Sequence, residues 1–91
     1  MQIRHDTTAH RFIGETPSGP AILAYAPAVE ATLELYSTYV PAAERGRGLG
    51  GQLVKAAVAY AREQGVSIIP TCWYVAEWLA IHPEHQDLVK R

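Results

Sequence analysis

The sequence predicts an α/β fold of the mixed α+β kind, with a mostly antiparallel sheet, one strand-helix-strand crossover and a C-terminal helix. Two observations predict it. Short runs rich in apolar, β-branched and aromatic residues fill the first 40 positions, with turn residues between them, as antiparallel strands require. Helical periodicity over residues 51–64 is then followed by an apolar run at 66–69 and a second helical run at 74–81. A strand, a helix and a strand in that order predict a parallel crossover.

The first two strands are expected at residues 2–5 and 10–15. A dense turn signal, Thr-Pro-Ser-Gly-Pro at residues 16–20, is followed by an apolar run at 21–26 that completes a hairpin with the second strand. Pro27 is expected to end this hairpin, because proline cannot donate a hydrogen bond to a neighbouring strand.

The fourth strand is expected at residues 32–40, with Pro41 closing it. Strict alternation divides its side chains between two faces, one carrying Leu33, Leu35, Ser37 and Tyr39 and the other carrying Glu34, Tyr36 and Thr38.

The helix at residues 51–64 has one apolar stripe and a glycine, Gly65, that is typical of a helix C-terminus. The stripe consists of Leu49, Leu53, Val54, Ala57, Val58 and Ala61. Pro70 is expected to end the strand at 66–69. The helix at 74–81, which Pro83 ends, is expected to bury Val75, Trp78 and Leu79.

Length and composition predict one domain over residues 1–91 with a small core, since 48% of the residues are hydrophobic and 19% are charged. The net charge of -1 lacks the basic excess of a dedicated nucleic-acid binder, so we expect no direct nucleic-acid contact. Neither a secretion signal nor an apolar run long enough to span a bilayer is evident, which predicts a soluble, cytoplasmic protein without membrane contact.

The single cysteine, Cys72, excludes an internal disulfide framework, fits a reducing compartment and makes a cysteine-based zinc site improbable. His82 and His85 are three positions apart, but Pro83 breaks the helix that would align them and no third ligand is evident. No metal site is therefore expected, and these histidines are read as part of a solvated chain end.

The segment Arg45-Gly46-Arg47-Gly48-Leu49-Gly50, followed by Gly51, lies between a predicted strand and a predicted helix. Glycines let backbone N–H groups approach an anion, and the helix behind them adds the positive end of its dipole. We interpret the segment as a pyrophosphate-binding turn in which either arginine assists; an ordinary flexible connection is the alternative. Neither the Walker pattern nor the dinucleotide fingerprint fits it.

The same segment resembles the Arg/Gln-x-x-Gly-x-Gly/Ala motif of the GNAT superfamily of acetyl-CoA-dependent N-acetyltransferases. Residues 70–75 and 82–89 resemble a branch of very small, stand-alone GNAT-like proteins, and the likeness spans about 12–89. It implies a GNAT-like sheet and a coenzyme A pyrophosphate at Arg45 to Gly50. It also implies a pantetheine arm between the strand ending at Val40 and the strand ending at Ile69.

Cys72 is a candidate catalytic residue, because it lies where a strand gives way to a helix N-terminus, near the position that the resemblance implies for the acetyl group. A free thiol is only a few per cent thiolate at neutral pH, so a nucleophilic role needs the help that a helix N-terminus can supply. The alternative is a buried structural cysteine.

Direct transfer to an amine is the second route and needs a base. In the branch that this chain resembles, a His-Thr pair precedes the glycine turn, and the matching residues here are Ser37 and Thr38. Glu34, Tyr36 and Tyr74 are the substitutes considered for the missing histidine, with sheet surface or packing as their alternative role. Trp73 and Trp78 are further candidates for a substrate groove, with core packing preferred for Trp78.

The resemblance thus implies acetyl-CoA (coenzyme A) as cofactor and acetyl transfer to an unidentified amine, either a protein lysine or a small molecule. A non-catalytic acyl-CoA-binding or protein-interaction module is the alternative, and a generic anion-binding domain is a third possibility. The oligomeric state stays open, because an exposed sheet edge can pair with a partner.

Overall fold

Five strands form one sheet in the order β1-β2-β3-β4-β5 in the computed structural model, which describes residues 1–90. Their bounds are β1 Ile3–Asp6, β2 Arg11–Thr16, β3 Gly19–Ala28, β4 Thr32–Tyr39 and β5 Ser67–Ile69. The first four strands are antiparallel neighbours, whereas β4 and β5 are parallel. The predicted mixed sheet with one parallel crossover is therefore confirmed.

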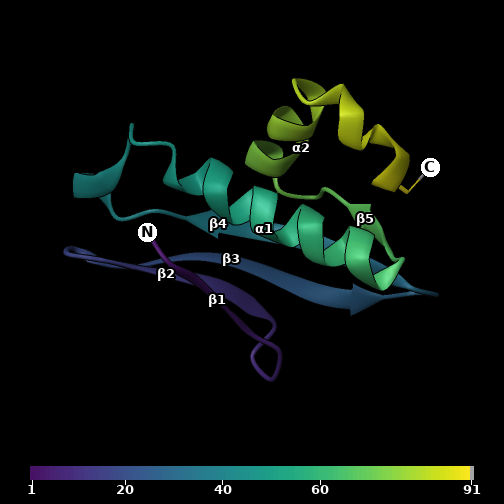
Figure 1. Cartoon of the computed structure of the whole chain (residues 1–91), viewed down its shortest axis with the longest axis horizontal. Coiled ribbons are helices and arrows are strands. Elements are labelled where there is room, and N and C mark those ends of the chain that lie inside the picture. Colours follow the sequence, from purple (N-terminus) through teal and green to yellow (C-terminus); the bar gives the residue numbers. More distant parts are fainter. Residues whose placement is uncertain (91) are drawn as a thin grey trace.

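Two α-helices and two 3-10 turns complete the fold. Their bounds are η1 Ala42–Glu44, α1 Leu49–Gln64, α2 Trp73–Ala80 and η2 Pro83–Leu88. Helix α1 lies across one face of the sheet, and α2 and η2 gather beside β5 (Figure 1). No helix of the part of the chain that the structure describes is long and apolar enough to cross a membrane.

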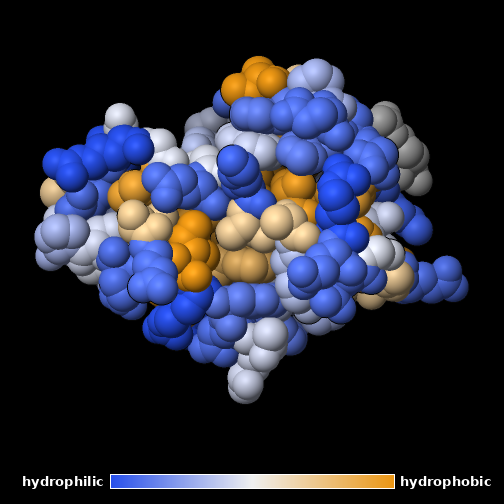
Figure 2. Space-filling model, viewed as in Figure 1, coloured by the Kyte–Doolittle hydropathy of each residue, from blue (hydrophilic) through white to orange (hydrophobic). Residues whose placement is uncertain are grey.

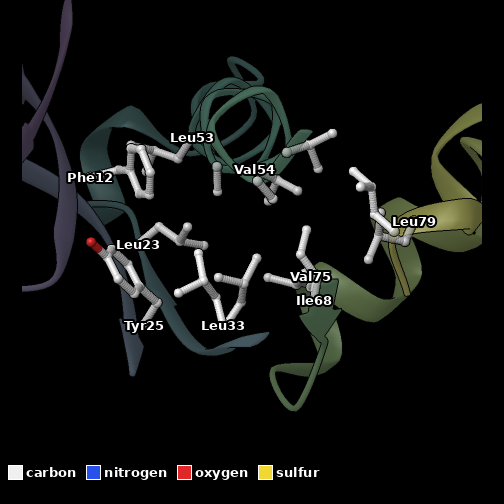
Figure 3. Packing of buried hydrophobic residues seen from close by; sticks show 14 of the residues in the cluster. Phe12, Leu23, Tyr25, Leu33, Leu53, Val54, Ile68, Val75 and Leu79 are labelled. Carbon is white, nitrogen blue, oxygen red and sulfur yellow. The ribbon is translucent and has the colours of Figure 1, made fainter. Parts of the chain in front are cut away.

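The core lies between α1 and the sheet, with α2 closing one side. In Figure 3, Leu53 and Val54 of α1 point toward Leu23 of β3, while Val75 and Leu79 approach from α2. All five side chains are almost fully buried. The apolar stripe predicted for α1 therefore packs as expected, and its small alanines bring the helix close to the strands.

The segment after α2 covers the outer edge of β5. The backbone N–H of Lys90 donates to the Ile68 carbonyl at 2.8 Å, and Arg62 of α1 makes two hydrogen bonds to the carboxylate of Asp87 at 3.0 and 3.1 Å. Half-buried Trp78 packs against the core and stacks on His82 with ring centroids 3.8 Å apart. The segment after α2 thus covers the edge of the sheet that β5 would otherwise expose.

The predicted boundaries of the strands and α-helices lie within two residues of the observed ones, and two of the differences have a clear physical cause. Strand β3 continues through Pro27 to Ala28, because β2 ends its pairing at Ala24 and leaves the proline nitrogen at a free edge where no donor is needed. Helix α1 begins at Leu49 and not at residue 51, since Gly48 adopts a left-handed backbone (φ 75°) and serves as its N-cap.

The predicted division of β4 into two faces was also wrong beyond Leu35. Tyr25 pairs with Leu35 but Ala24 pairs with Ser37, so Tyr36 is an extra residue in a β-bulge. Opposite residues share a face, and Thr38 lies opposite the buried Leu23. Thr38 therefore faces the helices, and Ser37 lies exposed on the open face.

Candidate functional site

A cavity opens where β4 and the segment after β5 separate. The parallel pairing of β4 with β5 ends at Glu34 and Ile69, and one further hydrogen bond, from the Cys72 N–H to the Leu35 carbonyl at 3.0 Å, holds the two segments together. Beyond it the chain turns into α2, and a cavity of about 660 Å³ fills the gap. Its lining residues are Thr38, Tyr39, Val40, Glu44, Arg45, Gly46, Gly48, Leu49, Gly50, Cys72, Trp73 and Tyr74.

One end of the cavity is the glycine loop, residues 45–50. Gly46 (φ 85°) and Gly48 (φ 75°) both adopt left-handed backbone, which favours glycine. No side chain of residues 1–90 caps α1 at Gly48, so the backbone N–H groups of its first turn point out of the helix end unpaired by a cap. Such a helix end attracts phosphate.

The two arginines of the loop are placed differently. Arg45 lines the cavity, and its Nε donates to the Val40 carbonyl at 2.9 Å, which ties the loop to the end of β4. Arg47 lies outside the cavity lining and forms an ion pair with Glu44 at 3.4 Å. Figure 2 shows strongly hydrophilic residues, in dark blue, over the end of the molecule where Figure 1 has η1 and this loop. Arg45 is thus the cation at the cavity.

Cys72 and Thr38 meet in the lining of the same cavity. The Thr38 Oγ1 lies 3.6 Å from the Cys72 Sγ. Burial acts to raise the pKa of the Cys72 thiol. Hydrogen bonds from the backbone N–H groups of Val75 and Tyr74 at the start of α2, and from Thr38, act to lower it. These hydrogen bonds outweigh burial, so the pKa lies below its ordinary value. The thiol is therefore closer to the thiolate than a free cysteine is.

Glycines at the N-terminus of α1 allow aromatic side chains of α2 to pack close to its backbone. A Cβ on Gly50 would lie 2.8 Å from the Tyr74 hydroxyl oxygen, and one on Gly51 would lie 3.2 Å from Nε1 of Trp78. Only glycine at position 50 leaves room for the phenol of Tyr74, which lines the cavity beside the first turn of α1.

Most residues singled out from the sequence reach this cavity. Thr38, Val40, Arg45, Gly46, Gly48, Leu49, Gly50 and Cys72 line it, as does Tyr74. Ser37, Arg47 and Gly51 are not among the lining residues. Glu34 is not among the lining residues either and accepts a hydrogen bond from the Thr71 hydroxyl at 2.6 Å, and Tyr36 is exposed at the bulge.

Sequence reasoning missed Tyr39 and Glu44 and left Trp73 undecided. Trp73 lines the cavity and is 71% exposed, although a tryptophan in so small a protein is usually core. Glu44 is buried in the 3-10 helix before the glycine loop. Its position next to Arg45 is the one sequence feature that could have indicated that it belongs to the site.

Comparison with known proteins gives a consistent result. The family described as GCN5-related N-acetyl-transferase matches residues 11–88. Human Protein NATD1 is 35% identical over 90 residues, which span 97% of this chain and 80% of the human protein. Protein NATD1 of Xenopus tropicalis is 37% identical over 68 residues, which span 75% of this chain and 62% of the frog protein. The NMR structure of a GCN5-like protein from Staphylococcus aureus superposes with a TM-score of 0.78 at 25% identity, over 98% of this chain and 87% of that one.

Proposed function

This chain belongs to the GCN5-related N-acetyltransferase family, and on that premise we propose that it binds acetyl-CoA and transfers the acetyl group to an amine. The observation that carries the proposal is that one cavity of about 660 Å³ is lined both by an anion-attracting loop and by the pair formed by Thr38 and Cys72. A phosphate site and a polar, nucleophilic pair in one cavity suit a ligand that has both a charged end and a reactive end.

The residues present fit the cofactor. The left-handed glycines at 46 and 48 bring backbone N–H groups to the surface of the loop, and Arg45 adds a positive charge at the cavity wall. A pyrophosphate would bind here. Val40 and Leu49 offer an apolar wall for the arm between the charged end and the reactive end.

The bound cofactor would supply a thioester, an acyl donor that an uncharged amine can attack. The chain's own groups there would be the Cys72 thiol with its lowered pKa and the Thr38 hydroxyl, and the Tyr74 phenol lines the same cavity. Thr38 and the N-terminus of α2 can stabilise a thiolate at Cys72, which is a nucleophile able to take up an acyl group. The Tyr74 phenol is a hydroxyl that can donate a proton to a leaving group.

A non-catalytic acyl-CoA-binding role is the second candidate, and one observation favours it. Glu44 is the one carboxylate among the lining residues, and Ser18 and Arg47 already engage it at 3.0 and 3.4 Å. The resemblance implies a histidine at the position of Ser37, which is exposed and is not among the lining residues of the cavity. No histidine lines the cavity within residues 1–90, and of the three residues considered as substitute bases only Tyr74 does.

Consumption of acetyl-CoA separates the two roles. The full-length chain is incubated with acetyl-CoA and a panel of lysine peptides and polyamines, and release of free coenzyme A thiol is followed against samples without amine. An acetyltransferase releases thiol in proportion to the amine. Two outcomes would favour the binding module. Thiol release could be independent of the amine, or no thiol could be released although acetyl-CoA is measured to bind. Cys72→Ser then tests the covalent route, which requires an acetyl adduct on Cys72 detectable by mass spectrometry.

A further inference from the structure

Glu44 is a buried acidic residue beside a loop whose other features attract anions. It is 5% exposed, and together with Thr32 it makes up the buried polar side chains of the described chain. It lines the same cavity as Arg45 and the glycines. A carboxylate in this place repels a phosphate and halves the net positive charge that the two arginines would provide. Electrostatics toward the ligand therefore does not explain it.

The contacts of Glu44 link two distant parts of the chain. Its Oε2 accepts a hydrogen bond from the Ser18 hydroxyl at 3.0 Å, and its Oε1 pairs with Arg47 at 3.4 Å. Ser18 lies at the tip of the turn between β2 and β3, 26 residues earlier. That turn is itself fixed, because Thr16 Oγ1 donates to the Gly19 carbonyl at 2.6 Å and accepts from the Ser18 N–H at 3.2 Å.

The backbone on both sides of Glu44 is held as well. The Glu44 N–H donates to the Pro41 carbonyl at 2.8 Å, and Arg45 reaches back to the Val40 carbonyl at 2.9 Å. The chain that follows contains two left-handed glycines and has no regular structure before Leu49. Glycine loops lose much conformational entropy on ordering, so a ligand that had to order this loop would bind weakly.

We propose that Glu44 is a positioning residue for the phosphate loop. It fixes the start of the loop to the β2–β3 turn through Ser18 and holds the Arg47 side chain out of the cavity, so that the backbone N–H groups are ordered before the ligand arrives. The proposal rests on the proposed coenzyme A site. If Glu44 acted only through its charge, removing the carboxylate from an anion site would tighten coenzyme A binding. The positioning role predicts the opposite, that removing it weakens binding.

The test is the affinity of the full chain for coenzyme A, measured by calorimetry at one fixed salt concentration. Glu44→Ala should bind about tenfold more weakly, as expected for loss of hydrogen bonds to a charged group. Ser18→Ala should weaken binding less but in the same direction, and Glu44→Gln, which can still accept from Ser18, should lie between wild type and Glu44→Ala. Glu15→Ala is the matched control, since it removes a carboxylate from an exposed pair with Arg4 on β1 and should leave affinity unchanged.

Hydrogen exchange of the ligand-free proteins provides an independent readout. Backbone amides at residues 46–51 should exchange faster in Glu44→Ala and in Ser18→Ala, with exchange in β1 and β2 unaltered. Equal or tighter binding by a folded Glu44→Ala with unchanged loop exchange overturns the proposal. If Glu44→Ala does not fold, Ser18→Ala decides by the same criteria. If the wild type does not bind coenzyme A, the proposed function fails, and loop exchange alone decides whether Glu44 orders the loop.

Discussion

Thr38 Oγ1 lies 3.6 Å from Cys72 Sγ, across the gap between β4 and the start of α2. This contact exists because Tyr36 is an extra residue in β4 and turns Thr38 toward the helices. The sheet irregularity thus creates the polar pair at the end of the cavity, in keeping with the frequent occurrence of bulges beside functional sites.

The pair predicts a reactive thiol. Hydrogen bonds from the N-terminus of α2 and from Thr38 lower the pKa of Cys72 despite its burial, so alkylation by iodoacetamide should accelerate at lower pH than alkylation of free cysteine in the same buffer. Thr38→Val should move the midpoint of the rate profile to higher pH. A profile that matches free cysteine, or one that Thr38→Val leaves in place, would contradict this view of the pair.

Gly50 should not tolerate alanine, although the motif of the wider family accepts glycine or alanine there. A Cβ at this position would meet the Tyr74 hydroxyl at 2.8 Å and the ring carbon Cζ at 2.9 Å. Overpacking usually costs about 1–3 kcal/mol and the helix-propensity gain offsets up to about 1 kcal/mol, so Gly50→Ala should lower the free energy of unfolding by a net amount of up to about 2 kcal/mol. Urea denaturation measures it.

Tyr74→Ala supplies the control for that prediction. In this background the clash is gone and only helix propensity is left, so adding Gly50→Ala should be neutral or stabilising. An equal cost in both backgrounds would show that Tyr74 is not the obstacle.

His5 should make the fold sensitive to mild acid. The Nε2 of His5 lies 2.6 Å from the Tyr25 hydroxyl. Burial lowers the pKa of His5, the charge of Asp6 opposes this shift, and His10 adds to it. The unfolded chain therefore binds this proton more readily, and stability is lost as the pH falls through the unfolded value of about 6.5. The urea concentration at the midpoint of unfolding should decrease as the pH is lowered from about 7.5 to about 5.5, the range in which histidines titrate. In His5→Phe the fall should be smaller; an identical fall would assign the effect to other groups.

The two arginines of the glycine loop should differ in their effect on coenzyme A binding. Arg45 lines the cavity, whereas Arg47 is paired with Glu44 outside it. Arg45→Ala should weaken coenzyme A binding by about tenfold, the scale of one charge-assisted hydrogen bond, and Arg47→Ala by less. Calorimetry at low salt measures both, and the reverse order would show that Arg47 leaves Glu44 when the ligand binds.

The order of elements and the position of the loop could be predicted from local patterns. The turn at residues 16–20, the apolar stripe of α1 and the glycines before it are signals that depend on near neighbours in the chain. The family resemblance drawn from the glycine motif and from residues 70–75 and 82–89 is confirmed by the family match over 11–88.

The faces of β4 could not be predicted, because the bulge at Tyr36 carries no glycine or proline and arises from pairing with β3. The same limit applies to Pro27, whose tolerance depends on where β2 ends, and to Glu44, whose burial depends on a turn 26 residues away. These are tertiary effects on single residues, and they decide which side chains reach the cavity.

Calorimetric titration of acetyl-CoA into the wild-type 91-residue chain and two variants of it measures whether acetyl-CoA binds at the glycine loop. Gly48 and Gly65 both adopt left-handed backbone, with φ of 75° and 69°, at opposite ends of α1. Gly48→Glu and Gly65→Glu therefore impose similar backbone strain and the same added charge, but only the first alters the cavity. We expect saturable binding to the wild type and to Gly65→Glu, and none to Gly48→Glu. Absence of binding to the wild type at millimolar acetyl-CoA, or undiminished binding to Gly48→Glu, would contradict this expectation.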